Sequence, residues 1–310
     1  IRVAARAKAD SVKFQLIHTD ELYLPGQYEY GHYEIAKVLE RRRKEELSQE
    51  TYAAMAALAR ELGIDFTASV FDPGGLDRLR ALHPPYVKIA SWDRNNLRFL
   101  RKVARSGMPV VLSTGMSELV DVDKAVAVLR EENVSKLVIL HCVSVYPAPL
   151  SITHLSMIPK IKERYGVEVG FSDHTEGTEA ACMAMAVGAT WFEKHYTTDR
   201  SQEGFDHAHA ADEAELTRYV RVLREAWSAL HAEGPKISEQ ERYTRKRARR
   251  GLYASRDLEA GHVLTESDIL VLRPEGPMDA DLAETLEGRT LSIPLKAFQP
   301  YRAEIVGRAT

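Results

Sequence analysis

The sequence up to about position 231 alternates short apolar runs with amphipathic stretches of helical length. Seven runs are rich in Val, Ile and Phe and too short for buried helices, and they predict strands at 11–17, 65–70, 86–90, 109–113, 136–143, 168–172 and 190–195. Helices are expected between them, for example at 49–62, 95–106, 119–131 and 152–165. Strict alternation of this kind favours a parallel sheet with right-handed crossovers.

The number of predicted strands favours one architecture. Seven parallel strands are one short of a closed eight-stranded barrel, and residues 3–9 look like a helix that leads into a strand. We therefore predict an α/β fold, a (β/α)8 TIM barrel whose first strand lies upstream of Ile1. An open doubly wound sheet is the alternative, but no glycine-rich dinucleotide loop follows an early strand.

The pattern changes near position 232. Gly234 and Pro235 break the alternation, and a charged run follows with six basic residues between Arg242 and Arg250. A solvated linker or helix face explains this run better than a nucleic-acid site. Short β-like pieces follow at 251–255, 263–264, 269–272 and 290–293. We predict a barrel domain at 1–233, a linker at 234–249 and a small β-rich domain at 250–310.

Composition excludes several classes of partner. Of the 310 residues, 45% are hydrophobic and 28% charged, and the net charge of -3 gives no reason to expect nucleic acid or an anionic membrane. No apolar run approaches the roughly 18 residues of a membrane span. The chain has two cysteines, Cys142 and Cys182, both in the expected core. Such sparse use fits a reducing cytoplasm.

Two predicted strands end in a histidine. The strand at 168–172 leads to His174, and the strand at 190–195 ends in His195. Carboxyl ends of parallel strands are where ligands bind in barrels and open sheets. Two imidazoles with few other strong ligands suit a divalent ion that keeps positions open for substrate and water. For either histidine alone, a simple strand cap is the better explanation; for both together we favour a site.

Other strand ends carry polar residues where apolar ones would pack better. These are Lys13, Gln15, Ser69, Lys88, Ser91, Ser113, Thr114, His141, Tyr146 and Ser172. Two lysines and several hydroxyls facing one cavity would bind phosphate or carboxylate, aided by helix N-termini in the following loops. For Lys13 alone a solvated strand end is an equal alternative, so the repetition carries the prediction.

Six motifs appear together in one order: V-K-F-Q, Y-V-K-I-A-S, V-L-S-T-G-M, L-H-C-x-S-x-Y-P, G-F-S-D-H-T and F-E-K-H-Y-T. With the C-terminal segment R-R-G-L-Y-A-S-R-D-L-E-A-G-H-V-L-T, they make nearly the whole chain resemble the sialic acid synthase family. Members of that family make nonulosonic acids and carry an antifreeze-like (SAF) domain after the barrel.

The resemblance implies an activity. Such an enzyme condenses phosphoenolpyruvate with an N-acetylated hexosamine and releases phosphate, in polysaccharide biosynthesis such as that of bacterial surfaces or spore coats. His174 and His195 would hold Mn2+ or Mg2+, which polarises the sugar aldehyde. Arg273 would reach the partner's active site in a domain-swapped homodimer.

The resemblance also assigns the remaining site residues. Asp93, Asp206 and Lys88 would serve catalysis. Substrate would contact Lys13, Gln15, Ser69, Lys88, Ser91, Ser113, Ser144, Tyr146, Ser172 and Arg273.

Three departures from the family pattern concern the sugar side. Asp93 stands where the family commonly has Glu, Ser144 where it often has Asn, and A-H-A-A-D-E follows Asp206 in place of an S-L-E-P type segment. The assignment of phosphoenolpyruvate is therefore firmer than that of any sugar. Two alternatives stay open: a condensing enzyme of the 3-deoxy-octulosonate type, and a barrel that binds an acidic sugar or phosphate without turnover.

Overall fold

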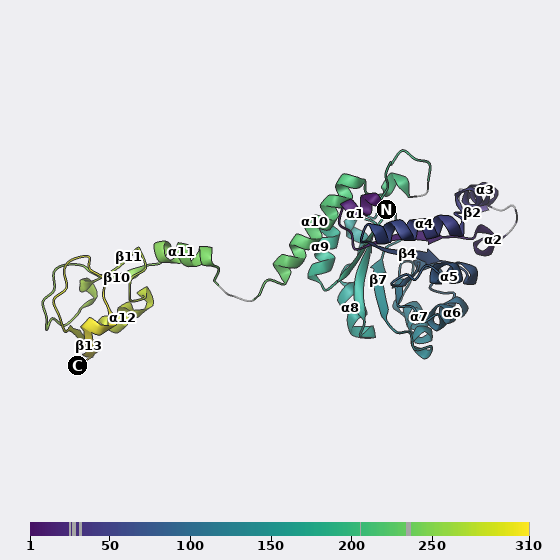
Figure 1. Ribbon diagram of the computed structural model, residues 1–310. Helices are drawn as coiled ribbons and strands as arrows, with labels where there is room; N and C mark the ends of the chain where they lie inside the picture. Colours follow the sequence, from purple (N-terminus) through teal and green to yellow (C-terminus); the bar gives the residue numbers. More distant parts are fainter. Residues whose placement is uncertain (25, 27–28, 31–32, 205, 234–236, 310) are drawn as a thin grey trace. The chain divides into compact units, whose positions relative to one another are not determined.

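The computed structural model describes residues 1–24, 26, 29–30, 33–204, 206–233 and 237–309. The chain divides into two compact units, Ile1–Ala232 and Glu233–Thr310 (Figure 1). Each unit has a hydrophobic core of its own.

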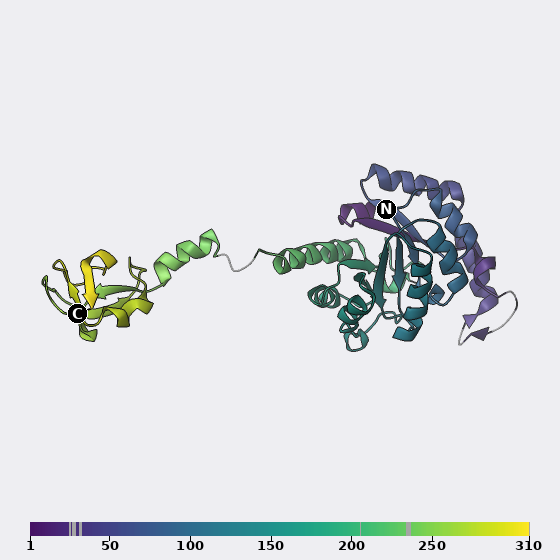
Figure 2. The same cartoon turned by 90° about the horizontal axis from the view of Figure 1, so that it is seen from below.

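The first unit is built on one parallel sheet of seven strands, which curls like part of a barrel (Figure 2). In sheet order the strands are β1 (Ser11–Leu16), β4 (Asp65–Val70), β5 (Val87–Ile89), β6 (Val110–Ser113), β7 (Leu137–Cys142), β8 (Glu168–Asp173) and β9 (Trp191–Lys194). All seven predicted strands are confirmed, and each end lies within one residue of its predicted position. β6 and β7 are buried along their whole length, as expected of strands covered on both faces.

Helices cover the outer side of this sheet. They are α1 (Arg2–Arg6), α4 (Gln49–Glu61), α5 (Pro73–Arg80), α6 (Leu97–Arg105), α7 (Leu119–Glu131), α8 (Met157–Tyr165), α9 (Glu179–Ala186) and α10 (Glu213–Leu230). α6 shows why they pack here: Phe99, Leu100, Val103 and Ala104 form one buried stripe, while its charged residues lie on the other side.

Local capping sets several helix ends. The Asp72 carboxylate accepts the backbone N–H of Gly75 at 2.8 Å, and Pro73 opens α5. Gly166 ends α8 in the left-handed conformation, with φ of 60°. The helix predicted at 152–165 begins only at Met157, because His154 has a φ of 46° that no α-helix continues through.

Between β1 and β4 the chain forms α2 (Thr19–Leu22), the two short strands β2 (Glu29–Tyr30) and β3 (Tyr33–Glu34), and α3 (Ile35–Glu45). Within the described part of the chain, β1 and β9 are the two edges of the large sheet. A cavity of about 1030 Å³ is lined by both edges, by α10 and by α1. The eighth strand of a closed barrel stays a prediction.

The second unit consists of short antiparallel pairs around a small core. β10 (Gly251–Ala254) pairs with β11 (Ile269–Leu272), and β12 (Arg289–Leu291) pairs with β13 (Val306–Ala309). A short helix, α12 (Ala283–Leu286), lies between the two pairs in the sequence. The sequence predicted the first three of these strands but not β13. The piece predicted at 263–264 contributes only an isolated bridge from Val263 to Thr290.

The segment predicted as a linker contains a helix, α11 (Glu239–Ala248). Ser238 caps it, and Arg245 on its last turn pairs with Glu275 at 2.7 Å. These contacts place α11 with the second unit, and none of its residues is buried, which fits its charged composition. Residues 234–236, including the predicted break at Gly234-Pro235, lie outside the described residues.

Membrane insertion was not expected from the sequence. Within the described residues, every helix is too short or too polar to cross a bilayer.

Candidate active site

The carboxyl ends of β1, β5 and β9 bring two lysines to one glutamate. The Lys13 Nζ atom lies 3.8 Å from Glu193 Oε2, and the Lys88 Nζ atom lies 3.7 Å from Glu193 Oε1. We call Lys13, Lys88 and Glu193 the lysine–glutamate cluster. Glu193 was not among the predicted site residues. Strand alternation gives a hint of its position, because Glu193 lies two residues before His195 and alternation directs both side chains to the same side.

Serine hydroxyls surround this cluster. Lys13 donates to Ser69 Oγ at 3.4 Å, Lys88 donates to Ser113 Oγ at 2.5 Å, and Ser172 donates to Glu193 Oε1 at 2.8 Å. The structure thus brings together five predicted substrate-binding residues from β1, β4, β5, β6 and β8.

The neighbouring charges shift the pKa values of Glu193 and Lys88. Burial disfavours the Glu193 carboxylate, but Lys13, Lys88 and the Ser172 hydroxyl outweigh burial and lower its pKa to about 2. Burial lowers the pKa of Lys88, and Glu193 partly offsets that shift. Since two amino groups face a single carboxylate, a multiply charged anion would find complementary partners here.

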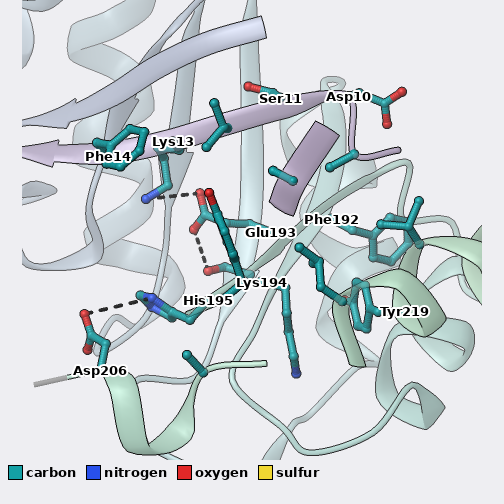
Figure 3. A pocket seen from close by; sticks show the side chains of 18 of the residues that line it. Asp10, Ser11, Lys13, Phe14, Phe192, Glu193, Lys194, His195, Asp206 and Tyr219 are labelled. Carbon is teal, nitrogen blue, oxygen red and sulfur yellow. Dashed lines mark hydrogen bonds and ion pairs between the residues drawn. The ribbon is translucent and has the colours of Figure 1, made fainter. Parts of the chain in front are cut away.

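The histidine pair, His174 and His195, lies beside this cluster. The two rings are 5.3 Å apart between centroids, and the Tyr146 ring is 4.2 Å from the ring of His174. Asp206 approaches His195, with 3.9 Å between Oδ2 and Nδ1 (Figure 3). A small cavity is lined by Tyr146, Asp173, His174, Lys194, His195, Asp206 and His209.

The pKa values of the two imidazoles are shifted in opposite directions. Burial, together with Lys13 and the other imidazole, lowers the pKa of His195 to about 4 against the opposing effect of Asp206. Burial also disfavours the charged form of His174, but contacts with the Cys142 thiol and the Val143 carbonyl outweigh it and raise its pKa. The sequence assigned Cys142 to the core. Its Sγ atom is buried there, 3.9 Å from His174 Nδ1.

The histidine pair fits a divalent ion that keeps open coordination positions. His174 Nδ1 lies 2.8 Å from the Val143 carbonyl, so Nε2 stays available for a metal, as is usual for metal-binding histidines. Within the described residues, no three His, Cys, Asp or Glu side chains gather closely enough to hold a metal by themselves. The structure would offer such an ion two imidazoles, with Asp206 near one of them, and substrate or water would have to complete the coordination.

The remaining predicted substrate-binding residues lie outside the lysine–glutamate cluster and the histidine pair. Gln15 lines the large cavity. Ser91 and Ser144 converge on Gly115, where a Cβ atom would collide with both hydroxyls. Arg273 is exposed in the second unit.

Asp93 follows β5 in a 3-10 turn. Its side chain is buried and its Oδ2 atom has no hydrogen-bond partner. Burial alone raises the pKa of Asp93 to about 7, so this carboxyl exchanges a proton near neutral pH.

A curled parallel sheet with polar and imidazole side chains at its carboxyl ends defines an α/β protein of the barrel type, with a candidate ligand site where barrel enzymes have theirs. Comparison with known proteins identifies the family. The chain belongs to the NeuB family: a model of that family matches residues 1–234, and the SAF domain matches residues 249–303. This is a family of nonulosonic acid synthases, and the predicted resemblance, barrel-type fold and C-terminal SAF domain are confirmed.

Individual relatives support the same family. The chain is 34% identical to the spore coat polysaccharide biosynthesis protein SpsE of Bacillus subtilis, over 88% of this chain and 78% of that protein. It is 31% identical to the N,N'-diacetyllegionaminic acid synthase of Legionella pneumophila, over 96% and 86%. A crystal structure of a putative spore coat polysaccharide biosynthesis protein E from Chromobacterium violaceum superposes with a TM-score of 0.76 at 27% identity, covering 98% of this chain and 93% of that one.

Proposed function

We propose that this chain condenses phosphoenolpyruvate with an N-acetylated hexosamine similar to N-acetylmannosamine, forming a nonulosonic acid and releasing phosphate for polysaccharide biosynthesis. The observation that carries the proposal is the lysine–glutamate cluster with its serine hydroxyls, directly beside the histidine pair. The names of the relatives, which include acid synthases, support the same class of reaction. Free thiols at Cys142 and Cys182 agree with synthesis in the cytoplasm.

The cationic part of the site would bind phosphoenolpyruvate. Lys13 and Lys88 would neutralise its phosphate and carboxylate, and Ser69, Ser113 and Ser172 would donate hydrogen bonds to the same oxygens. Glu193 holds both amino groups in place before the anion arrives.

The imidazole part of the site would receive the sugar. His174 and His195 would hold Mn2+ or Mg2+, and this ion would supply Lewis-acid polarisation of the aldehyde oxygen. The burial that keeps His195 neutral also keeps its nitrogen lone pair free for coordination. Tyr146 packs against both rings and limits the space left for the sugar.

The bond changes require a proton acceptor. The electrons of the C2=C3 double bond of phosphoenolpyruvate form the bond from C3 to the aldehyde carbon, and the aldehyde oxygen takes up a proton to become a hydroxyl. Water adds to C2, and the C2–O bond to the phosphate group breaks to leave a keto group and inorganic phosphate. The water must lose a proton to a carboxylate. We propose Asp93 for this role, because it follows the carboxyl end of β5 and its pKa is about 7; Asp206, beside the histidine pair, is the second candidate.

We propose a homodimer because apolar side chains near the site are exposed and because Arg273 is exposed in the second unit. The loops after β5, β6 and β7 expose the large apolar side chains of Trp92, Met116, Val145 and Leu150 at the edge of the site. Exposed apolar clusters of this kind mark interaction surfaces. We propose that the second unit of another copy covers this edge and brings Arg273 to the N-acyl sugar, in a domain-swapped homodimer.

The test is phosphate release from phosphoenolpyruvate by the full-length protein with Mn2+, across a panel of N-acetylated hexoses and of phosphorylated aldoses that lack the N-acetyl group. Release that requires one of these sugars and is lost in His174→Ala supports the proposal. His231→Ala is the matched control, since His231 is an exposed histidine at the end of α10. Release only with a phosphorylated aldose that lacks the N-acetyl group would indicate the 3-deoxy-octulosonate type. Binding of phosphoenolpyruvate without release under any sugar would indicate a non-catalytic barrel.

A further inference from the structure

The ends of β8 and β9 carry one charged residue each that lines the small cavity at the histidine pair and whose charged group reaches the outer layer. Asp173 is the last residue of β8 and precedes His174, and Lys194 is the last residue of β9 and precedes His195. Asp173 and Lys194 are directly paired in the sheet register. Because strand residues alternate between faces, both side chains point to the outer layer, where they meet Tyr219 of α10. Lys194 and Tyr219 are labelled in Figure 3.

We call Asp173, Lys194 and Tyr219 the outer cluster. Their polar groups pair with one another. The Tyr219 hydroxyl donates to Asp173 Oδ2 at 3.0 Å, and Lys194 Nζ lies 3.3 Å from the same oxygen. Asp173 Oδ1 accepts the backbone N–H of Thr175 at 2.8 Å and its hydroxyl at 2.7 Å, while Lys194 donates to the Thr175 carbonyl. The Lys194 Nζ atom also lies 5.3 Å from the centre of the Tyr219 ring.

The cluster is buried, which makes its charges costly. The side chains of Lys194 and Asp173 have 9% and 0% of their surface exposed, and Tyr219 is buried as well. A buried ion pair generally stabilises a fold no better than apolar side chains of the same volume. Stability alone therefore gives no reason for charges at this position.

What the outer cluster does provide is a fixed backbone around each imidazole. Both residues that flank His174, Asp173 and Thr175, are hydrogen-bonded into the cluster. Lys194, which makes one of these bonds, is the residue next to His195. The cluster thus links the backbone next to His174 with the backbone next to His195.

We propose that Asp173, Lys194 and Tyr219 are positioning residues that set the spacing of the histidine pair for a divalent ion. This inference rests on the proposed function, in which that pair holds the metal. It predicts that the geometry behind the imidazoles, and not only the imidazoles, determines the metal affinity.

The experiment measures Mn2+ binding to the full-length protein without substrate, from the electron paramagnetic resonance signal of the free ion, together with the melting temperature. Tyr219→Phe is expected to weaken Mn2+ binding roughly tenfold, and Lys194→Met roughly 10- to 100-fold. Lys194→Arg keeps a cation there and is expected to bind within a few-fold of the unmodified chain.

The matched control is Tyr165→Phe. Tyr165 is a buried tyrosine whose hydroxyl donates to Asp123 at 2.9 Å, on the outer helices α8 and α7. The Tyr165→Phe substitution removes the same kind of hydrogen bond as Tyr219→Phe. It is expected to lower the melting temperature about as much, with unchanged Mn2+ binding.

The outcomes separate this inference from the proposed function. Unchanged Mn2+ binding in Tyr219→Phe and Lys194→Met, with binding lost in His174→Ala, overturns the positioning role and leaves the metal site standing. Absence of Mn2+ binding in the unmodified chain overturns both. If Lys194→Met does not fold, Tyr219→Phe alone decides.

Discussion

Replacing Glu193 with Gln removes the only negative charge of the lysine–glutamate cluster while preserving its shape. The folded protein lowers the pKa of this carboxyl from 4.5 to about 2, which corresponds to about 3.4 kcal/mol of stabilisation at pH 7. Its side chain is 26% exposed, so solvent screening is limited. We expect Glu193→Gln to lower the free energy of unfolding by about 3 kcal/mol at pH 7, because Lys13 and Lys88 are left without their counter-charge.

The sign of the pH dependence follows from the lowered pKa. The stabilisation is fully present above the unfolded-state value of 4.5 and is lost as the pH falls through about 2. At pH 3 the same two values leave only about 1.4 kcal/mol of difference between the unmodified chain and Glu193→Gln.

Urea unfolding followed by tryptophan fluorescence measures this difference. The chain has three tryptophans, Trp92, Trp191 and Trp227, and all lie in the first unit, so the fluorescence reports the unit that contains Glu193. Glu225→Gln is the control: Glu225 pairs with Arg221 on the surface, where both side chains are more than half exposed, and its loss is expected to cost less than about 1 kcal/mol. A Glu193→Gln variant as stable as the unmodified chain at pH 7, or a difference that does not shrink by pH 3, would refute the reasoning.

Three further predictions concern activity. Chelation of divalent ions, or His195→Ala, is expected to abolish phosphate release, and Mn2+ should restore it only in the unmodified chain; undiminished release after chelation would contradict the metal role. Arg273→Ala is expected to raise the KM for the sugar while that for phosphoenolpyruvate stays nearly unchanged, which steady-state kinetics with each substrate varied would test. Because Asp93 has a pKa of about 7, phosphate release should rise with pH through neutrality, and Asp93→Asn should remove this limb and lower the rate roughly a hundredfold. A pH–rate profile that Asp93→Asn leaves intact would exclude it as the proton acceptor.

The sequence by itself determined the strands of the first unit and the places where polar residues end them. Strands of a parallel sheet are buried on both faces, so they stand out as short apolar runs, and all seven were found within one residue of their ends. Since parallel strands have their carboxyl ends on one edge, the common location of Lys13, Lys88, His174 and His195 followed as well.

Only the tertiary structure decided which of these residues touch. β9 lies at the far end of the sheet from β1, and the curl of the sheet is what brings Glu193 within 3.8 Å of Lys13. The burial of Asp93, the outer cluster behind the histidine pair, and the attachment of α11 to the second unit likewise depend on contacts between residues distant in the sequence. Periodicity encodes which face of an element is buried; the register and curvature that join different elements arise from the packing of the whole core, and no single stretch of sequence contains them.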